Sequence, residues 1–296
     1  MNKNSILRIS DLSIDTINQI LKDSKKFSRD FKDWQLSKSR LIANLFFEPS
    51  TRTHFSFVSA EHGLGLKVAD FIAQGSSITK GESLYDTVKT FEAIGYDALV
   101  IRHVKDNYFD ELENINIPII NAGDGSSNHP SQCLLDLYTV KEEFGEFNGL
   151  NVMIVGDIRH SRVAHGNKEV MTRLGCNVRF SGPLSYMDDM SEYTEFDEGI
   201  KTADVVMMLR IQHERHAEKM DLSKEEYLKR YGLTIDRVKN MKKNAIIMHP
   251  APVNRGVEIA DEVVEHEKSR IFKQMENGVL VRKAMIKTIF NESFGK

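Results

Sequence analysis

A group of hydroxyl side chains and one arginine follows the first apolar segment of the chain. Leu41–Phe47 leads into Glu48-Pro49-Ser50-Thr51-Arg52-Thr53, where a helix running to Gly63 is expected to begin. A helix N-terminus offers unpaired N–H groups and a positive dipole end, and hydroxyls and a guanidinium add donors. Serine and threonine are also ordinary helix caps, but capping does not account for an arginine between two threonines. These four residues therefore predict a phosphate-binding site without the Walker glycines: Ser50, Thr51, Arg52 and Thr53.

A second loop brings an imidazole and an amide to the same kind of position. Asn121 to Gln132 reads as the end of a strand, a Gly-rich turn and the start of a helix. A histidine such as His129 is more often structural than catalytic, and Gln132 could simply cap the helix. Arg102, which ends the preceding apolar segment, strengthens the functional interpretation. A cation and an imidazole beside a phosphate can polarise a carbonyl oxygen.

Two loops in the second half of the chain also carry arginines. The segment from Gly156 to Arg162 has a single glycine, so it lacks the G-x-G-x-x-G pattern and predicts no NAD site. In the segment from Leu209 to Arg215, strand alternation puts Arg210 and Gln212 on one face as two donors pointing together. Either arginine taken alone could equally form a surface ion pair.

The remaining motifs add backbone acceptors but no metal ligand set or covalent nucleophile. Pro250 and Pro252 stiffen the loop from Met248 to Gly256 and leave its carbonyls to accept hydrogen bonds. His213 and His216 are three residues apart, with no third ligand nearby. A nucleophile elbow and the protein-kinase signatures are both absent. The pattern predicts an enzyme for a small, multiply anionic substrate that needs no metal and no cofactor.

Composition excludes several other classes of protein. The 296 residues carry 40 Lys+Arg and 43 Asp+Glu, and the net charge of -3 gives no basic surface for nucleic acid or an acidic membrane. The longest apolar run, Val205–Leu209, is far shorter than the ~20 residues that span a bilayer. Met1 is not followed by the apolar stretch expected of a signal peptide, and two cysteines cannot form a disulfide framework. The expected location is the cytoplasm.

The elements that must position these loops alternate along the chain. An amphipathic helix is expected to start near Asp15, and helical stretches then separate short apolar strands, a pattern that favours parallel α/β sheets. A boundary near residue 133 divides the strands between two such sheets, and ligands bind beyond the carboxyl ends of strands in folds of this kind. The predicted strands are Leu41–Phe47, Ala98–Arg102, Ile117–Ala122, Val152–Gly156, Asn177–Phe180, Val205–Leu209 and Ala245–Met248.

Several of these motifs together resemble the catalytic chains of aspartate carbamoyltransferases, within the aspartate/ornithine carbamoyltransferase family. The resemblance runs in the family's order over essentially the whole chain. The matching strings are Phe-x-Glu-x-Ser-Thr-Arg-Thr (Phe46 to Thr53), His-Pro-Ser-Gln-x-Leu-Leu-Asp-Leu (His129 to Leu137), Leu-Arg-Ile-Gln-x-Glu-Arg (Leu209 to Arg215), His-Pro-Ala-Pro-Val-Asn-Arg-Gly-Val-Glu-Ile (His249 to Ile259) and Gln-x-x-Asn-Gly (Gln274 to Gly278).

The resemblance implies two α/β domains, each a parallel sheet flanked by helices, with the active site in the cleft between them. Residues 1–133 and the C-terminal helix 281–296 would bind carbamoyl phosphate, and residues 134–280 would bind L-aspartate. The implied reaction gives N-carbamoyl-L-aspartate and phosphate, an early step of de novo pyrimidine biosynthesis. It needs no cofactor and no metal.

The resemblance also assigns roles to single residues. Ser50, Thr51, Arg52 and Thr53 would hold the phosphate. The carbamoyl oxygen would face Arg102, His129 and Thr53, and its amino group Gln132. Ala251 and Pro252 would also contact carbamoyl phosphate. For aspartate, Arg162 would hold the α-carboxylate, and Arg210 with Gln212 the side-chain carboxylate.

One implied feature concerns assembly. The loop Gly75-Ser76-Ser77-Ile78-Thr79-Lys80-Gly81 matches the family's mobile loop, in which Ser76 and Lys80 reach into a neighbouring subunit's site and Lys80 also contacts aspartate. A homotrimer with shared sites is therefore expected. The sequence does not decide whether a regulatory chain also binds. The chain departs from the family by carrying Ser131 where threonine is commoner, and His54 and His165 where basic residues are usual.

Two alternatives compete with this interpretation. Ornithine carbamoyltransferases share the phosphate motif, but ornithine ends in an ammonium that needs an acceptor, whereas Arg210 and Gln212 are donors. A non-catalytic paralogue that only binds carbamoyl phosphate is expected to have lost some of the reactive side chains. The chain retains Arg52, Lys80, Arg102 and His129.

Overall fold

The computed structural model describes residues 2–72, 77–188, 190–211 and 223–294. The chain forms two compact units, Met1–Tyr138 with Met275–Lys296, and Thr139–Gln274. Two helices, α4 (Pro130–Phe144) and α10 (Ile271–Ile289), each contribute residues to both units. The predicted loops fall within one unit or the other, so each unit can be examined by itself.

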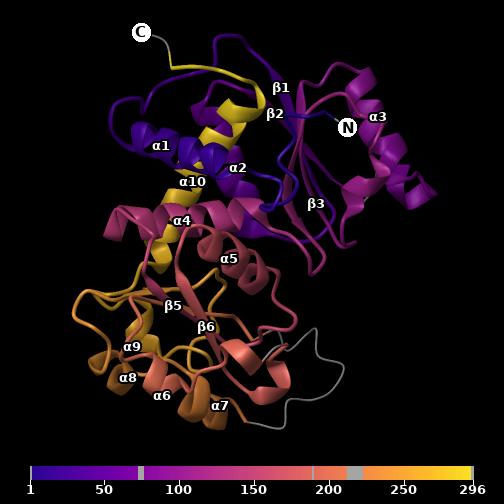
Figure 1. Cartoon of the computed structure of the whole chain (residues 1–296). Helices are drawn as coiled ribbons and strands as arrows, with labels where there is room; N and C mark the ends of the chain where they lie inside the picture. Colours follow the sequence, from indigo (N-terminus) through magenta and orange to yellow (C-terminus); the bar gives the residue numbers. More distant parts are fainter. Residues whose placement is uncertain (1, 73–76, 189, 212–222, 295–296) are drawn as a thin grey trace. The chain divides into compact units, whose positions relative to one another are not determined.

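The first unit contains a four-stranded parallel sheet of order β2-β1-β3-β4. Asn44 points toward α2, whose Glu61 it contacts, whereas Ala43 and Leu45 share a core with Val88 of α3. The sheet is therefore covered on both faces, with α2 on one side and α3 on the other (Figure 1). Its elements are α1 (Ile14–Arg29), β1 (Leu41–Phe46), α2 (Thr51–Gly63), β2 (Lys67–Phe71), α3 (Leu84–Ala93), β3 (Ala98–His103) and β4 (Ile119–Asp124), with the short helices η1 (Ser77–Lys80) and η2 (Tyr108–Glu111).

The second unit contains another four-stranded parallel sheet, of order β6-β5-β7-β8. Met153 of β5 lies against α6, and Met207 of β7 faces α5, where Asn167 contacts its sulfur, so helices again cover both faces. Its elements are β5 (Asn151–Val155), α5 (Arg162–Arg173), β6 (Asn177–Ser181), α6 (Phe196–Gly199), β7 (Val205–Met208), α7 (Lys224–Tyr231), α8 (Ile235–Lys239), β8 (Ile246–Met248) and α9 (Asp261–Val264), with the short helices η3 (Leu184–Tyr186) and η4 (Met190–Glu192).

The predicted fold class, two parallel-sheet α/β domains, is confirmed. Each predicted strand exists within a residue or two of its expected bounds. The edge strand β2 was not predicted, because Lys67 and Asp70 interrupt its apolar pattern and the strand has no fully buried residue. Of the helices in the described residues, none has the length and hydropathy that a bilayer crossing requires.

Candidate active site

Strand order locates one site in each sheet. In an open parallel sheet, ligands bind beyond the carboxyl ends of two neighbouring strands whose connections run in opposite directions. In the first unit these strands are β1 and β3, and in the second they are β5 and β7. Arg52, Arg162 and Arg210 follow β1, β5 and β7, and Arg102 is the last residue but one of β3.

The predicted phosphate loop lies at the start of α2, directly after β1. Ser50 is the residue before the first helical turn, with φ -159° and ψ 90°, and its side chain makes no capping hydrogen bond in the described structure. The capping alternative therefore does not hold for Ser50. Thr51 and Arg52 are exposed, and Thr53 is 7% exposed on the inner face of the helix. The first turn of α2 carries no acidic residue that would compete with an anion.

Arg102 lies beside this loop because β1 and β3 pair in register. Phe46 is the partner of Arg102 in the ladder, and the Phe47 N–H donates to the Arg102 carbonyl over 2.9 Å. Arg102 is 9% exposed, and its side chain donates from Nη1 to the Ala122 carbonyl over 3.1 Å and forms an ion pair with Glu48. The guanidinium is therefore fixed at the end of the sheet by two groups of the protein.

A carboxylate shapes the turn that leads to His129. Asp124 accepts hydrogen bonds from the side chains of Asn121, at 2.9 Å, and Asn128, at 3.1 Å, and from the Asn107 N–H at 2.6 Å. These bonds close the turn between β4 and α4. His129, 6% exposed, follows the turn just before the first residue of α4.

Gln132 is oriented by a second buried carboxylate. Its Nε2 donates to Asp136 Oδ1, one helical turn later, over 2.9 Å. Because a carboxylate oxygen accepts, this contact uses the NH₂ end of the amide and not the Gln132 carbonyl oxygen. The Gln132 carbonyl oxygen can accept from an N–H group of a ligand.

Gly156 allows the loops after β5 and β7 to approach each other closely. A Cβ on Gly156, whose φ is +137°, would lie 2.9 Å from the Leu209 Cβ, and the Leu209 N–H donates to Val155 over 2.8 Å. The loops after β5 and β7 are thereby in direct contact. Arg162, 8% exposed, begins α5 on the first of these loops, and the half-buried Arg210 follows β7 on the second.

The loop after β8 is held by a histidine. The Ala251 N–H donates to His249 Nδ1 over 2.8 Å, so the ring carries its proton on Nε2, which donates to Glu258 Oε1 over 3.1 Å. His249 and Glu258 are both buried. His249 thus shapes the loop that contains Ala251 and Pro252, and the described contacts use both of its ring nitrogens.

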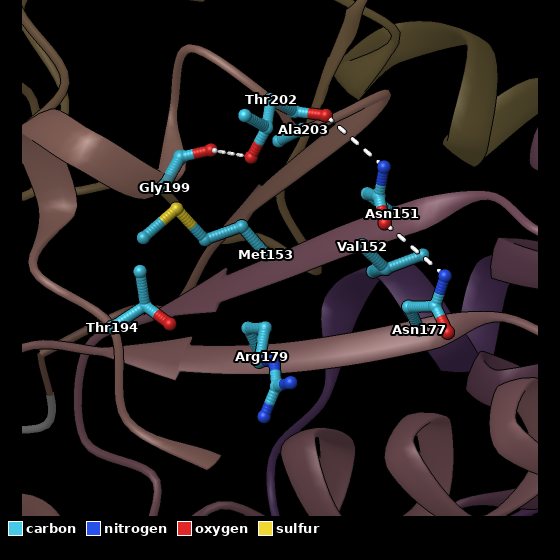
Figure 2. A pocket seen from close by; sticks show the side chains of 9 residues that line it. All are labelled: Asn151, Val152, Met153, Asn177, Arg179, Thr194, Gly199, Thr202 and Ala203. Carbon is cyan, nitrogen blue, oxygen red and sulfur yellow. Dashed lines mark hydrogen bonds between the residues drawn. The ribbon is translucent and has the colours of Figure 1, made fainter.

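A cavity of about 320 Å³ in the second unit lies at the amino ends of the strands, opposite the loops that carry Arg162 and Arg210 (Figure 2). It is lined by Asn151 and Asn177, the first residues of β5 and β6, and by Thr202, which precedes β7. Its polar groups bond one another: Asn177 Nδ2 donates to Asn151 Oδ1 over 3.2 Å, and Asn151 Nδ2 to the Thr202 carbonyl over 3.3 Å. The cavity is therefore separate from the loops that carry the chemistry.

Comparison with known families is decisive. The carbamoyl-phosphate-binding domain of aspartate/ornithine carbamoyltransferases matches residues 4–142, and the Asp/Orn-binding domain of the same family matches residues 148–289. This chain belongs to the aspartate/ornithine carbamoyltransferase family. Together the two matches span nearly the whole chain, as the motifs predicted.

Solved structures of aspartate transcarbamoylase from Trypanosoma cruzi are similar over the full length. The complex with carbamoyl phosphate and aspartate is 26% identical, with a TM-score of 0.86, over 97% of this chain and 97% of that one. The complex with N-(phosphonacetyl)-L-aspartic acid is 26% identical, with a TM-score of 0.85, over 97% and 96%. The complex with carbamoyl aspartate and phosphate is 27% identical, with a TM-score of 0.85, over 97% and 96%.

The predicted site residues of this family member divide between the two units. The first unit brings the Ser50–Thr53 loop and Arg102 to neighbouring strand ends, and places His129 and Gln132 at the start of α4. The second unit places Arg162 and Arg210 on loops in contact, and Ala251 and Pro252 on the loop after β8. Lys80 is exposed at the end of η1. Ser76 and Gln212 lie outside the described residues.

Sequence reasoning missed the groups that hold these side chains. Glu48 pairs with Arg102, and Asp136 orients Gln132. Glu48 lies within the phosphate motif and Asp136 lies four residues after Gln132, so both signals were visible in the sequence. The two unusual histidines also have acidic partners: His54 Nε2 is 2.7 Å from Asp70 Oδ1, and His165 Nε2 is 2.7 Å from Asp188 Oδ2.

Proposed function

We propose that this protein transfers the carbamoyl group of carbamoyl phosphate to the α-amine of L-aspartate, releasing N-carbamoyl-L-aspartate and phosphate. One observation carries the proposal: each sheet has donor-bearing loops at its own switch point, and donors suit two anionic substrates. The related Trypanosoma cruzi enzyme, which covers 97% of this chain, was solved with carbamoyl phosphate and aspartate bound. The product would enter pyrimidine biosynthesis.

In the proposed reaction, charge develops on the carbonyl oxygen of an already activated substrate. The neutral amine of aspartate attacks the carbamoyl carbon, and the bond to phosphate breaks. We assign Thr53, Arg102 and His129 as the donors to that oxygen, and one well-placed donor of this kind contributes roughly 3–4 kcal/mol. Holding two reactants together supplies much of the remaining acceleration.

The phosphate would be held by Ser50, Thr51, Arg52 and Thr53, at the positive end of α2. It would leave as an anion at the same place and take the proton that the attacking amine releases. This assignment needs no separate general base. Gln132, whose NH₂ group donates to Asp136, would accept from the carbamoyl NH₂ through its carbonyl oxygen.

The aspartate side would use the arginines of the second unit. Arg162 is assigned to the α-carboxylate, and Arg210 with Gln212 to the side-chain carboxylate. A guanidinium binds a carboxylate through two parallel hydrogen bonds. The ammonium of ornithine would face Arg210 and be repelled, so the ornithine alternative is not favoured.

Product formation tests the function directly. The purified protein is incubated with carbamoyl phosphate and either L-aspartate or L-ornithine, and phosphate and carbamoylated product are both measured. We expect carbamoyl aspartate and phosphate in equal amounts with L-aspartate, and no product above background with L-ornithine. Carbamoyl phosphate binding without any turnover would instead favour the non-catalytic paralogue, and citrulline formation would favour the ornithine enzyme.

We also propose that the protein acts as a homotrimer in which Ser76 and Lys80 complete a neighbour's site. The support is the match of the loop from Gly75 to Gly81 to the family's mobile loop. The exposure of Lys80 at the end of η1 is compatible with a role outside its own unit. A mixing experiment that tests this proposal is described below.

A further inference from the structure

A buried arginine lies behind the loop that carries His129. Arg282, on α10, is 3% exposed, and its Nη2 donates to the Ser131 hydroxyl over 3.3 Å. Its guanidinium lies over the ring of Phe57, 4.9 Å from the centroid. Ser131 Oγ is in turn 3.5 Å from His129 Nδ1. The three polar side chains form a chain of contacts from α10, through the first turn of α4, to the imidazole.

The chemistry of these groups gives the chain a direction. A guanidinium has donors and no acceptor, so the Ser131 oxygen accepts from Arg282. The hydroxyl proton is then available to the other neighbour, His129 Nδ1. A neutral imidazole that accepts at Nδ1 carries its proton on Nε2. The ring then presents an N–H at Nε2, as a donor to a carbonyl oxygen must.

Arg282 lies among other charged groups. Arg102, on β3, is a second cation close enough to interact with it electrostatically. Asp136, on α4, is the acidic group that faces Arg282. Burial lowers the pKa of Arg282 to about 9, Asp136 opposes that shift, and Arg102 adds to it. Arg282 therefore stays charged at neutral pH.

We propose that Arg282 is a positioning residue: through Ser131 it fixes His129 as the neutral tautomer with its proton on Nε2. The contribution of Arg282 to catalysis rests on the proposed carbamoyl transfer, in which His129 donates to the carbonyl oxygen that becomes negative. The tautomer of His129 can be measured in the protein without substrate. The positioning role of Arg282 and the proposed carbamoyl transfer can therefore be refuted separately.

The proposal also gives a role to the Gln-x-x-Asn-Gly motif. Gly278 is helical, with no positive φ to explain a glycine. A Cβ at this position would lie 2.5 Å from Arg282 Nη1 and 3.3 Å from the Leu135 side chain. The guanidinium is buried and packs closely against this backbone position. Gly278 thus leaves the space that Arg282 occupies, one turn further along α10.

Nuclear magnetic resonance of the histidine ring nitrogens tests the tautomer. In the full-length protein labelled with ¹⁵N-histidine, the His129 signals are assigned by their loss in His129→Gln. We expect an unprotonated Nδ1 and a protonated Nε2 in the unmodified protein. Ser131→Ala and Arg282→Met should both move these signals toward a mixture of tautomers, whereas Ser131→Thr, which keeps the hydroxyl, should not.

A protonated Nδ1 in the unmodified protein would overturn the proposal, as would unchanged His129 signals in Ser131→Ala. Ser131→Ala removes one oxygen atom, so the test does not depend on whether Arg282→Met folds. Lys287→Met is the matched control, because Lys287 is a second buried cation on α10 that pairs instead with Asp23, over 2.9 Å. It should leave the His129 signals unchanged, and a change as large as that in Arg282→Met would also contradict the proposal.

Steady-state kinetics provides the second readout. We expect Ser131→Ala to lower kcat by at least about tenfold, short of the loss of ~10²–10³ that follows removal of a whole donor. The KM for carbamoyl phosphate should change by less than about threefold, because the phosphate loop is untouched. A rise in KM at constant kcat would refute the positioning role. Altered ring signals in an inactive protein would instead count against the proposed function alone.

Discussion

Arg102 is held in place by contacts within the protein. Glu48 pairs with its guanidinium, and the Ala122 carbonyl accepts from it over 3.1 Å. A donor that is already fixed loses little freedom when charge develops on the substrate, and its interaction strengthens in the transition state. Glu48 therefore both orients the Arg102 guanidinium and balances its charge.

Replacing Arg102 tests whether it acts in the transition state. We expect Arg102→Ala to lower kcat by ~10² or more, because the donor to the developing charge is lost. Steady-state kinetics with both substrates measures the effect, and circular dichroism checks that the variant is folded. A kcat within a few-fold of the unmodified protein, with only KM raised, would make Arg102 a binding residue and would contradict the proposed mechanism. Arg8→Ala, which removes a partly exposed arginine paired with Asp110, is the control and should keep kcat.

At the scale of elements, α2 and the sheet beneath it share a buried acid. Glu61, on α2, is fully buried and accepts from Asn44 Nδ2 of β1 over 2.8 Å. Burial raises the pKa of Glu61 from 4.5 to about 7; the Asn44 hydrogen bond opposes that shift, and the charge of Asp70 adds to it. The helix that carries the phosphate loop therefore packs through a carboxyl that releases its proton near neutral pH.

This raised pKa predicts how stability depends on pH. Below about pH 4.5 Glu61 is protonated whether folded or unfolded, so its contribution is fully present. As pH rises toward about 7 the unfolded chain releases the proton first, and the free energy of unfolding should fall by about 3 kcal/mol. Glu61→Gln has no such proton, so its stability relative to the unmodified protein should rise over this window.

Urea unfolding of both proteins at several pH values, at one protein concentration, measures the difference. Glu198→Gln is the control, because the Glu198 side chain is 72% exposed and should add little pH dependence. Parallel stability curves for Glu61→Gln and the unmodified protein would show that burial does not raise the pKa of Glu61. The pH dependence of unfolding that both proteins share would then arise from other titrating groups.

Elements were predictable from sequence where a strand is apolar over its whole length. β5 and β7, with their runs of Val, Met and Ile, are buried on both faces and were found directly. β2 was missed because an edge strand needs fewer apolar side chains. The contact of Arg282 with Ser131 joins residues 151 positions apart, and no local pattern encodes such a pairing. Candidate site residues on short motifs could therefore be proposed from the sequence, whereas the groups that contact them were found only from the fold.

At the scale of the whole molecule, the two sheets share one plan. Each has its second strand at the edge, then its first, third and fourth, and all strands are parallel. The sequence shows no internal repeat, because strand order depends on backbone pairing rather than on residue identity. This plan gives each sheet its own switch point. Under the proposed function, each of the two similar sheets would bind an anionic substrate at this edge, and the loops would set the difference in chemistry.

The proposed trimer makes a prediction about mixtures of inactive variants. If each site takes Arg52 from one subunit and Lys80 from the next, Arg52→Ala and Lys80→Ala trimers should both be nearly inactive. In a head-to-tail ring, every mixed trimer contains one junction where an intact Arg52 meets an intact Lys80. Random assembly at equal amounts makes about three-quarters of the trimers mixed, each with one good site, so roughly a quarter of full activity should return.

Dissociating and reassembling the two variants together is the experiment, with subunit exchange verified by native mass spectrometry. The matched control is a mixture of Arg52→Ala with Arg102→Ala. Both residues lie in the first unit of one chain and would serve the same site, so no junction can restore both and the control should stay inactive. Recovery in the first mixture alone supports a site completed by a neighbour. If exchange occurs and that mixture remains as inactive as its parents, Lys80 serves its own chain and the shared site is refuted.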